Sequence, residues 1–540
     1  MRTVKFPPAL IALLAGALSA LGFAPWDLWP VTLLAIAVLC WLVHTAGGPW
    51  AAAGRAWLFG WAHFAASLPW IAKAFTYQAK MPAALGWVAV LGLSAYLALF
   101  IALAGGLGHR LAARPAARVL ALAASWVLAE WLRGWVLTGF AWNPLGAIWL
   151  EAPGLAQMAA WIGSAGLSAL VVLAGGALWL AAIGTMRERL AAGATLAGLA
   201  VLAAIGLQRI NPSQFIGTPI IIVQPDIGQG EKYDPARARA HMDRYVEMTA
   251  TALARLSRPV ELPIGDTAAE LAAPAGLAAA ATTPPPAGPA PQPAMVVWPE
   301  GAVDALVEVD EAARRRLASA LRPGDVLLFG GTGLVADKSG RVTAYANSLF
   351  VLDSRARLIG RYDKSHLVPL GEYVPARGIM EAIGLARLVP GDYDFAAGPG
   401  PRTLALPGGL PAVGPLVCYE IIFPGAVVDP EKRPGWLANV SNDAWYGASG
   451  PPQHLAQSRL RAIEEGLPVA RATPTGVSAM VSAYGRVRVS IAAGRRDVIS
   501  TDLPPPLPRT LFSRRGHLVP GLLALLLLGA GLLVDRRKII

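Results

Sequence analysis

The chain has 540 residues, of which 55% are hydrophobic and 15% charged, and its formal net charge is +12. This length exceeds one ordinary domain, and soluble domains carry about a quarter charged residues, so the composition favours a membrane protein. Many Arg and Lys residues flank apolar runs instead of alternating with aromatic residues. This pattern excludes the usual nucleic-acid-binding classes, and we expect no nucleic-acid partner.

In chain order, seven apolar segments come first, and each approaches the roughly 20 residues that a membrane-spanning helix needs. An eighth lies near the C-terminus. The eight segments are Ala9–Phe23, Trp29–Val43, Ala56–Ile71, Ala83–Leu103, Val119–Leu137, Ala159–Ala182, Leu190–Leu207 and Leu518–Val534. We therefore predict a membrane domain over residues 1–208 and a C-terminal helix with a basic tail over 516–540. A cleaved signal peptide ending near Ser19 is an alternative for the first segment.

Positive charges in short loops predict the orientation of these helices, because such charges favour the cytoplasmic side. An N-terminus inside the cell places eleven of them inside: Arg2, Lys5, Arg55, Arg110, Arg114, Arg118, Arg187, Arg189, Arg536, Arg537 and Lys538. Four then lie in short outside segments: Lys73, Lys80, Arg133 and Arg209. Both termini are expected in the cytoplasm, with the part between the seventh and eighth helices outside the inner membrane, in the periplasm.

That intervening part, residues 209–515, is richer in charge and reads as one water-soluble α/β domain. Short apolar runs predict strands at Pro219–Gln224, Ala294–Glu300, Asp325–Gly333, Asn347–Asp353, Ala412–Glu420, Gly435–Asp443 and Ser478–Gly485. Helices are expected over Arg237–Leu256 and Gln453–Gly466. An Ala/Pro-rich segment, Thr267–Pro293, is expected to be an extended surface insertion without catalytic residues.

Three polar residues stand where predicted strands end: Glu300, Lys364 and Cys418. Ligands gather at strand ends in layered α/β folds, so these side chains can converge although they are distant in sequence. A thiolate is a nucleophile for acyl carbons, a carboxylate can act as its general base, and an ammonium can stabilise the oxyanion. Taken singly, each has an ordinary interpretation: a surface carboxylate, a surface lysine and a buried structural thiol.

The chain has two cysteines, and we expect no disulfide, because Cys40 lies in an apolar membrane segment. His366 and His454 are too isolated to predict a metal site, and no HExxH pattern is present. The proposed chemistry needs neither a metal nor another cofactor.

The motifs "WPE", "YDKSHLVPLGEYVP", "CYE" and "NVSNDAWYG", in this order, resemble the carbon–nitrogen hydrolase, or nitrilase, superfamily. The resemblance implies an αββα sandwich with a Glu-Lys-Cys triad. It assigns Glu300 as general base, Lys364 as oxyanion stabiliser and Cys418 as nucleophile.

Over nearly its full length the chain resembles a narrower family, the apolipoprotein N-acyltransferases. "KSHLVPLGEYVP" and "EWLRGWVLTGFAWNPLG" carry this likeness, and the Ala/Pro-rich insertion departs from it. The resemblance implies a nitrilase-like domain within eight membrane helices of a bacterial inner membrane. It implies ping-pong transfer of an acyl chain, through a cysteine thioester, from a phospholipid to a diacylglyceryl apolipoprotein. Alternatives are a membrane-anchored amidase acting on a small C–N substrate and a transporter with an inert external domain.

The same resemblance suggests roles for further residues near the triad. Glu372 is expected to orient Lys364, and Glu420 to position the base or the incoming amine. The backbone N–H of Tyr419 is a candidate oxyanion donor. Tyr233, in "QGEKYDP", stands where the family usually has Trp and is a candidate substrate contact. Both glutamates have the alternative of simply offsetting Lys364 in a salt-bridge network.

Other features leave two interpretations open. Glu130 and Arg133 lie one helical turn apart and form either a structural pair or a lipid headgroup site. The apolar stretch Ala376–Gly391 is either a membrane-facing lid or a packing helix. In "NDAWYG", Asn442 and Asp443 can form a turn, and Trp445 and Tyr446 can be core residues.

Overall fold

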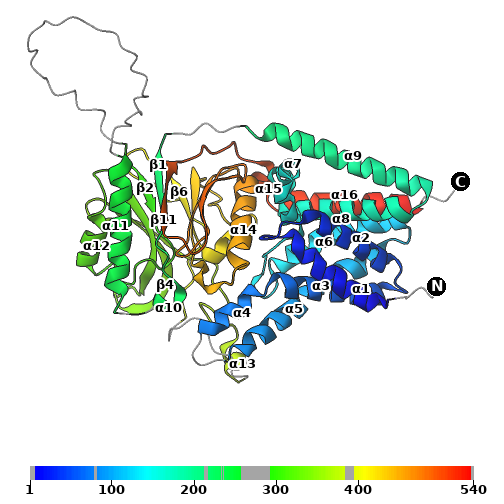
Figure 1. Cartoon of the computed structure of the whole chain (residues 1–540), viewed down its shortest axis with the longest axis horizontal. Coiled ribbons are helices and arrows are strands. Elements are labelled where there is room, and N and C mark those ends of the chain that lie inside the picture. The colour runs from blue at the N-terminus through cyan, green and yellow to red at the C-terminus, as the bar shows by residue number, and fades with distance from the viewer. Residues whose placement is uncertain are drawn as a thin grey trace, which may run out of the picture.

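The structure, a computed structural model, describes residues 6–77, 82–211, 217–232, 234, 236–256, 292–382 and 394–536. A bundle of helices makes up one half of the molecule and a pair of β-sheets the other (Figure 1). The α-helices of the bundle are α1 (Pro8–Ser19), α2 (Trp29–His44), α3 (Pro49–Ser67), α4 (Trp70–Ala74), α5 (Ala84–Leu111), α6 (Pro115–Arg133), α7 (Pro153–Ala156), α8 (Ala159–Ile183), α9 (Met186–Arg209) and α16 (Leu518–Arg536). Its 3₁₀ turns are η1 (Ala20–Gly22), η2 (Phe75–Tyr77), η3 (Val136–Thr138) and η4 (Leu145–Glu151).

Within the described residues, α5, α6, α8, α9 and α16 are long and apolar enough to cross a membrane. The apolar helices α1 and α2 are shorter. Several predicted boundaries were wrong by a few residues, because prolines begin these helices: α3 starts at Pro49 and α6 at Pro115. Arg133, which was assigned above to an outside loop, is the buried last residue of α6.

The other half of the molecule contains two sheets. The six-stranded sheet has the order β11–β1–β2–β3–β4–β5, and the five-stranded sheet β10–β9–β8–β7–β6. The strands are β1 (Pro219–Gln224), β2 (Met295–Val297), β3 (Val326–Ala336), β4 (Val342–Asp353), β5 (Leu358–Asp363), β6 (Val413–Val417), β7 (Trp436–Val440), β8 (Val469–Ala472), β9 (Ser478–Val481), β10 (Val487–Ile491) and β11 (Asp497–Asp502). Strands β1–β2–β3 and β6–β7–β8 pair in parallel, so their carboxyl ends share an edge in each sheet.

The remaining elements are α10 (Gln229–Lys232), α11 (Ala238–Leu256), α12 (Glu311–Ala318), α13 (Arg377–Ala382), η5 (Cys418–Ile422), η6 (Asp443–Trp445), α14 (Gly450–Glu465) and α15 (Leu511–Arg515). Apolar side chains of both sheets, such as Val297 and Val440, form one core between them. Helices α11 and α12 cover the outer face of the six-stranded sheet. Helix α14 lies on the other side, between the five-stranded sheet and the bundle (Figure 1). This is the expected αββα sandwich.

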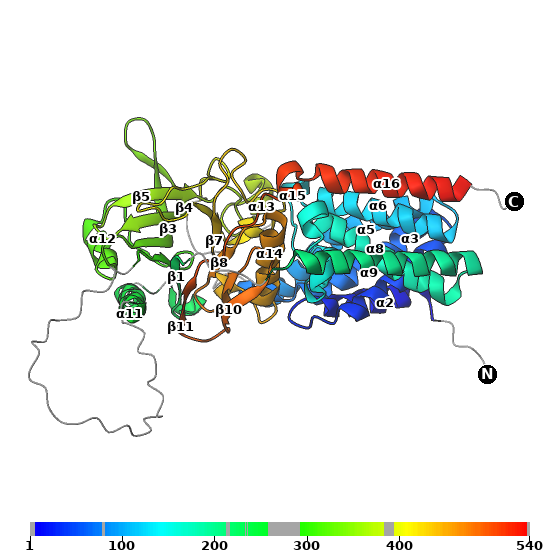
Figure 2. The same ribbon diagram turned by 90° about the horizontal axis from the view of Figure 1, so that it is seen from above.

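The helix bundle and the sandwich share a hydrophobic core. Leu437 of β7 and Leu460 of α14 belong to the same buried cluster as Leu167 of α8 and Trp142 of the loop after α6. Both ends of the chain lie at the end of the bundle remote from the sheets (Figures 1 and 2). The bundle therefore holds the sandwich by a packed interface and not by a linker alone.

Candidate active site

Cys418 directly follows β6 as the first residue of η5, so it begins a turn where the sequence predicted the end of a strand. Its φ angle is +50°, in the left-handed region that non-glycine residues rarely adopt. The side chain is buried, and its Sγ atom lies 3.8 Å from the hydroxyl of Tyr446. The sharp turn ends β6 at Cys418, which still packs with the apolar residues of the inter-sheet core.

Lys364 follows β5 and is 1% exposed. Its Nζ atom is 2.9 Å from Oε2 of Glu372 and 3.7 Å from Oε1 of Glu300. Burial disfavours the ammonium, but these two carboxylates outweigh it and hold the pKa of Lys364 above its usual range. Lys364 is thus a fixed positive charge.

Glu300 lies three residues after β2, beyond Trp298 and Pro299. The backbone N–H of Gly330 on β3 donates to the Pro299 carbonyl at 3.1 Å. A Cβ atom at Gly330 would stand 2.5 Å from Cα of Glu300, so only glycine permits this approach. Lys232 donates from Nζ to the Glu300 carbonyl at 3.1 Å.

Asn347 on β4 connects the two carboxylates beside Lys364. Its Nδ2 atom donates to Oε1 of Glu300 at 2.7 Å and to Oε1 of Glu372 at 2.6 Å. Asn347 is not among the predicted site residues, because the pattern "NSLFVLD" indicates only an apolar strand. Glu372 also accepts from the backbone N–H of Val368 at 2.8 Å, which fixes the loop that follows Lys364.

The protonation of Cys418 depends on these charges. Burial of the thiol and the Glu300 carboxylate raise the pKa of Cys418 above its usual range, while Lys364 and the backbone N–H of Asn442 partly offset them. At neutral pH the resting group is therefore a thiol, and reaction requires that a base remove its proton.

The Glu420 carboxylate is buried and accepts hydrogen bonds at both of its oxygen atoms. Its Oε1 atom accepts from the Tyr362 hydroxyl at 2.7 Å and from the Ser365 backbone N–H at 2.7 Å. Its Oε2 atom accepts from the backbone N–H of Val417 at 2.8 Å. The carboxylate thus ties the loop that carries Lys364 to the turn that carries Cys418.

Of the remaining predicted site residues, the structure describes Tyr419 but not Tyr233. The Tyr419 hydroxyl donates to the carbonyl of Gly139, in the loop after α6, at 3.0 Å. Its backbone N–H stays a predicted oxyanion donor. Tyr233 lies outside the described residues, as do residues 267–291 of the Ala/Pro-rich segment and residues 383–391 of the stretch considered as a lid.

The helix bundle contributes aromatic side chains to the site. Tyr446 packs against Trp70 after α3 and Trp142 after α6, with ring centroids 4.4 and 5.8 Å apart. The interpretation of Tyr446 as a core residue does not fully describe it, because its hydroxyl also faces the thiol of Cys418. The wall of the site next to Cys418 therefore comes partly from the bundle.

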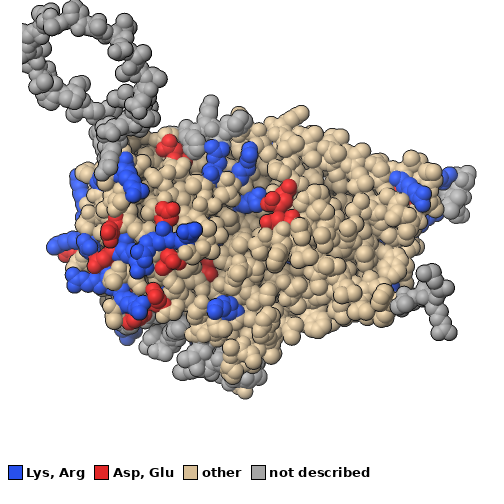
Figure 3. All heavy atoms as spheres, viewed as in Figure 1, with Lys and Arg blue, Asp and Glu red and all other residues tan. Residues whose placement is uncertain are grey.

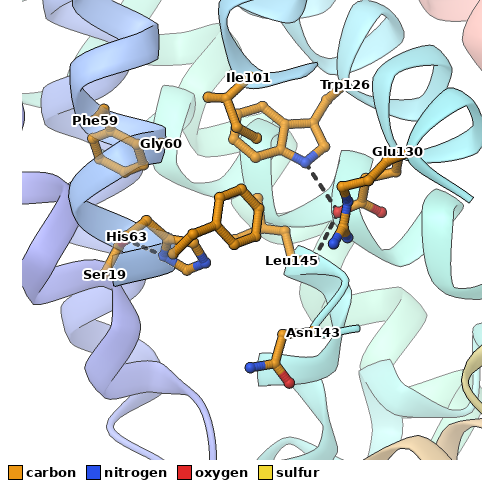
Figure 4. Close-up of a pocket in the computed structure, with 11 residues that line it drawn as sticks. Ser19, Phe59, Gly60, His63, Ile101, Trp126, Glu130, Asn143 and Leu145 are labelled. Atoms are coloured by element: carbon orange, nitrogen blue, oxygen red, sulfur yellow. Dashed lines mark hydrogen bonds between the residues drawn. The ribbon is translucent and has the colours of Figure 1, made fainter. Parts of the chain in front are cut away.

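Glu130 and Arg133 hold that wall in place. Arg133 donates from Nη1 to the carbonyls of Phe140 and Trp142, at 3.1 and 2.6 Å. Glu130 accepts from the Leu145 backbone N–H at 2.7 Å. The cavity beside them is about 20 Å³, which admits a water molecule but no lipid headgroup (Figure 4). The structural interpretation of this pair is the better one.

Cys418, Asp443 and His454 lie together and are of the residue types that bind metals. The guanidinium of Arg471, fully buried, pairs with the Asp443 carboxylate. A positive charge from the protein thus already occupies this cluster, and a metal ion would have to displace it.

The fold and this site define a membrane-embedded enzyme with a nitrilase-type catalytic domain. Residues 269–510 match the carbon–nitrogen hydrolase family, and residues 15–177 match the apolipoprotein N-acyltransferase N-terminal domain. The chain belongs to the apolipoprotein N-acyltransferase family.

Relatives with that name support the assignment over nearly the whole chain. The Rhodopseudomonas palustris protein is 35% identical over 98% of this chain and 95% of its own length. The Bradyrhizobium diazoefficiens protein is 36% identical with the same coverage, and the Caulobacter vibrioides protein is 37% identical over 92% of this chain and 89% of its own. A solved amidase from Nesterenkonia sp. has 16% identity and a TM-score of 0.34, and covers 55% of this chain and 92% of its own.

Proposed function

We propose that this enzyme transfers a fatty acyl chain from a membrane phospholipid to the α-amino group of the S-diacylglyceryl cysteine that begins an apolipoprotein. One observation carries the proposal. The buried thiol of Cys418 lies under the electrostatic influence of Glu300 and Lys364, at a sheet edge walled by the helix bundle. The relatives, all named apolipoprotein N-acyltransferase, support the substrate class.

In the first half-reaction, Glu300 accepts the thiol proton as the sulfur of Cys418 bonds to the carbonyl carbon of the lipid ester. Lys364, held as a cation by Glu372 and Glu300, stabilises the negative charge on the carbonyl oxygen. The C–O ester bond then breaks, and Glu300 returns the proton to the oxygen of the departing lysophospholipid. The acyl chain remains on Cys418 as a thioester.

In the second half-reaction, the α-amine of the apolipoprotein bonds to the thioester carbon and gives its proton to Glu300. The C–S bond breaks, and the Cys418 sulfur takes that proton back. The amine must react faster than water. The aromatic wall formed by Trp70, Trp142 and Tyr446 favours reaction with the amine over hydrolysis, because it limits the water near the thioester.

We further propose that residues 209–515 lie in the periplasm and that both termini are cytoplasmic. The termini lie at the end of the bundle away from the sheets, as an even number of crossings requires (Figure 2). Acyl chains leave the bilayer only at a cost of about 0.8 kcal/mol per CH₂. A catalytic site next to the bundle lets both lipid substrates react without leaving it.

The test is an acyl-enzyme measurement on the purified full chain in native phospholipids. Mass spectrometry of the wild-type protein should show Cys418 carrying a fatty acyl group, which a diacylated lipopeptide then removes. Cys418→Ala should abolish both signals, whereas Cys40→Ala, at the other buried cysteine, should retain them. Acylation that persists in Cys418→Ala contradicts the proposal, and release of ammonia from small amides without acyl transfer favours the amidase alternative.

A further inference from the structure

We propose that His454 is a positioning residue that holds the main chain on both sides of the nucleophilic thiol. This residue lies on α14 and has no exposed surface. Its Nε2 atom is 3.2 Å from the carbonyl oxygen of Cys418. Its Nδ1 atom is 3.0 Å from Oδ1 of Asp443. The inference deepens the proposed function and rests on it.

The contacts of the ring fix its hydrogen-bonding state. A carbonyl oxygen can only accept, so Nε2 must carry a hydrogen to bond to Cys418. Arg471 pairs with Asp443 and also lies 3.2 Å from Nδ1 of His454, to which its Nη2 atom can donate. Burial and the charge of Arg471 hold the pKa of His454 below its usual range, against the opposing influence of Asp443. The ring is therefore a neutral Nε2–H donor at pH 7.

The carbonyl of Cys418 requires such a donor because the residue is held at φ +50°. Left-handed conformations persist at non-glycine positions only where surrounding contacts fix them. Among the described residues, a second side-chain donor to this carbonyl is Nδ2 of Asn439, which is more distant, at 3.5 Å. His454 provides the shorter contact of the two.

On the other side of the sulfur lies the segment that contains Asn442 and Asp443. The backbone N–H of Asn442 acts on the Cys418 sulfur and favours its thiolate. Asp443 is the next residue. The Arg471 guanidinium pairs with its carboxylate and can donate to Nδ1 of His454, so it links this segment to the ring that bonds to the carbonyl of Cys418. The indole of Trp142, from the bundle, packs on the imidazole with ring centroids 5.0 Å apart. The ring is thus held from three directions.

The test compares His454→Gln, His454→Asn and His454→Phe in the full chain. The amide nitrogen of Gln can reach the position of Nε2, whereas that of Asn is too short and reaches only that of Nδ1. Two rates are measured for each variant: alkylation of Cys418 by iodoacetamide, and formation of the acyl-enzyme. The alkylation rate reports the position of the thiol even if the proposed acyl transfer is wrong.

We expect His454→Gln to keep both rates within about tenfold of wild type. The Asn and Phe variants should lose about a hundredfold in acyl-enzyme formation, as a displacement of the reacting atom of about 1 Å does. Ser458→Ala is the matched control, because Ser458 is buried one turn further along α14 and its hydroxyl donates to the His454 carbonyl. It should leave both rates unchanged.

Equal rates for the Gln and Asn variants overturn the proposal, as do wild-type rates for His454→Phe. Thermal unfolding is recorded for every variant. If the loss of rate follows a loss of folded protein across the whole series, His454 serves fold stability alone, and the positioning role is rejected. If the wild type forms no acyl-enzyme, the proposed function is rejected. If, in that case, Cys418 is still alkylated faster in His454→Gln than in His454→Asn, the positioning role is retained.

Discussion

Lys364 and the polar groups that contact it are each held by at least two partners. Lys364 lies between Glu300 and Glu372, and Asn347 bonds to both of these carboxylates. Such groups need little rearrangement when negative charge develops on a substrate oxygen, which is the condition for electrostatic catalysis. The resting thiol stays protonated until a substrate arrives.

The alkylation of Cys418 should therefore depend on pH in an unusual way. Burial and Glu300 raise its pKa above the usual value of about 8.5, and Lys364 offsets them only in part. Since the thiolate is the reactive form, the rate with neutral iodoacetamide should rise about tenfold per pH unit up to pH 9.5, without a plateau. Lys364→Met should be slower at every pH. Peptide mass spectrometry measures both, and a plateau below pH 8.5 would contradict this account.

Sequence patterns predicted some site residues and missed others for a physical reason. Glu300 and Cys418 come after apolar strands and Lys364 after a short mixed one, and these positions can be recognised from the sequence alone. Asn347 and His454 act through contacts across 47 and 36 residues of chain, to Glu300 and Cys418. Local sequence patterns do not report such contacts. The sequence therefore indicates only a strand residue at Asn347 and an isolated histidine at His454.

Helix α14 is the element that joins the two halves of the molecule. Gln453 accepts at Oε1 from the indole N–H groups of Trp70 and Trp142, at 3.0 and 2.9 Å. Its Nε2 atom donates to the carbonyl of Ser67 at 3.0 Å. One side chain thus bonds to three residues of the bundle at the active-site wall.

Gln453→Leu should destabilise the protein, because it leaves two buried indole N–H groups without an acceptor, at about 1–3 kcal/mol for each. Gln457→Leu is the matched control on the same helix. In the part of the chain that the structure describes, both amide atoms of Gln457 are buried without a hydrogen-bond partner. Thermal unfolding in detergent should show a lower Tm for Gln453→Leu and an unchanged or higher Tm for Gln457→Leu. Equal losses would show that the hydrogen bonds of Gln453 are not important.

The strands that were not predicted, such as β8 and β10, are those without a continuous apolar run. Strand β8 is fully buried, but Arg471 interrupts its pattern. Strand β10 is exposed over four of its five residues, so its composition resembles that of a loop. The strands of the inter-sheet core, such as β1 and β7, were predicted because burial on both faces demands continuous apolar residues.

Over the whole molecule, charged side chains are distributed unevenly between the sandwich and the bundle. On the face shown in Figure 3, charged side chains gather over the sandwich and at the far end of the bundle, and the flank between them is almost uncharged. A bilayer can surround such a flank, because its hydrocarbon core is about 30 Å thick and excludes charge. The charge pattern fits a bundle that lies in the bilayer with the sandwich beyond it, and the proposed orientation puts the sandwich on the periplasmic side.

Cysteine labelling in intact spheroplasts tests this orientation. Ser339→Cys, exposed on the sandwich between β3 and β4, should react with a membrane-impermeant maleimide. Arg187→Cys, exposed near the start of α9, should react only after the cells are broken. The native cysteines are both buried and provide a low background. The reverse pattern would place the catalytic domain in the cytoplasm.

The position of α14 also determines which segments of the chain must evolve together. One side of this helix contacts the nucleophile through His454, and another contacts the bundle through Gln453. The functional boundary between the halves therefore runs lengthwise along α14, well away from the point near residue 208 where the composition changes. A chimaera that takes its bundle from one relative and its sandwich from another would separate partners that fit only each other. We expect such chimaeras to work when α14 and the loop after α6 are exchanged together, so these two segments should evolve as one unit.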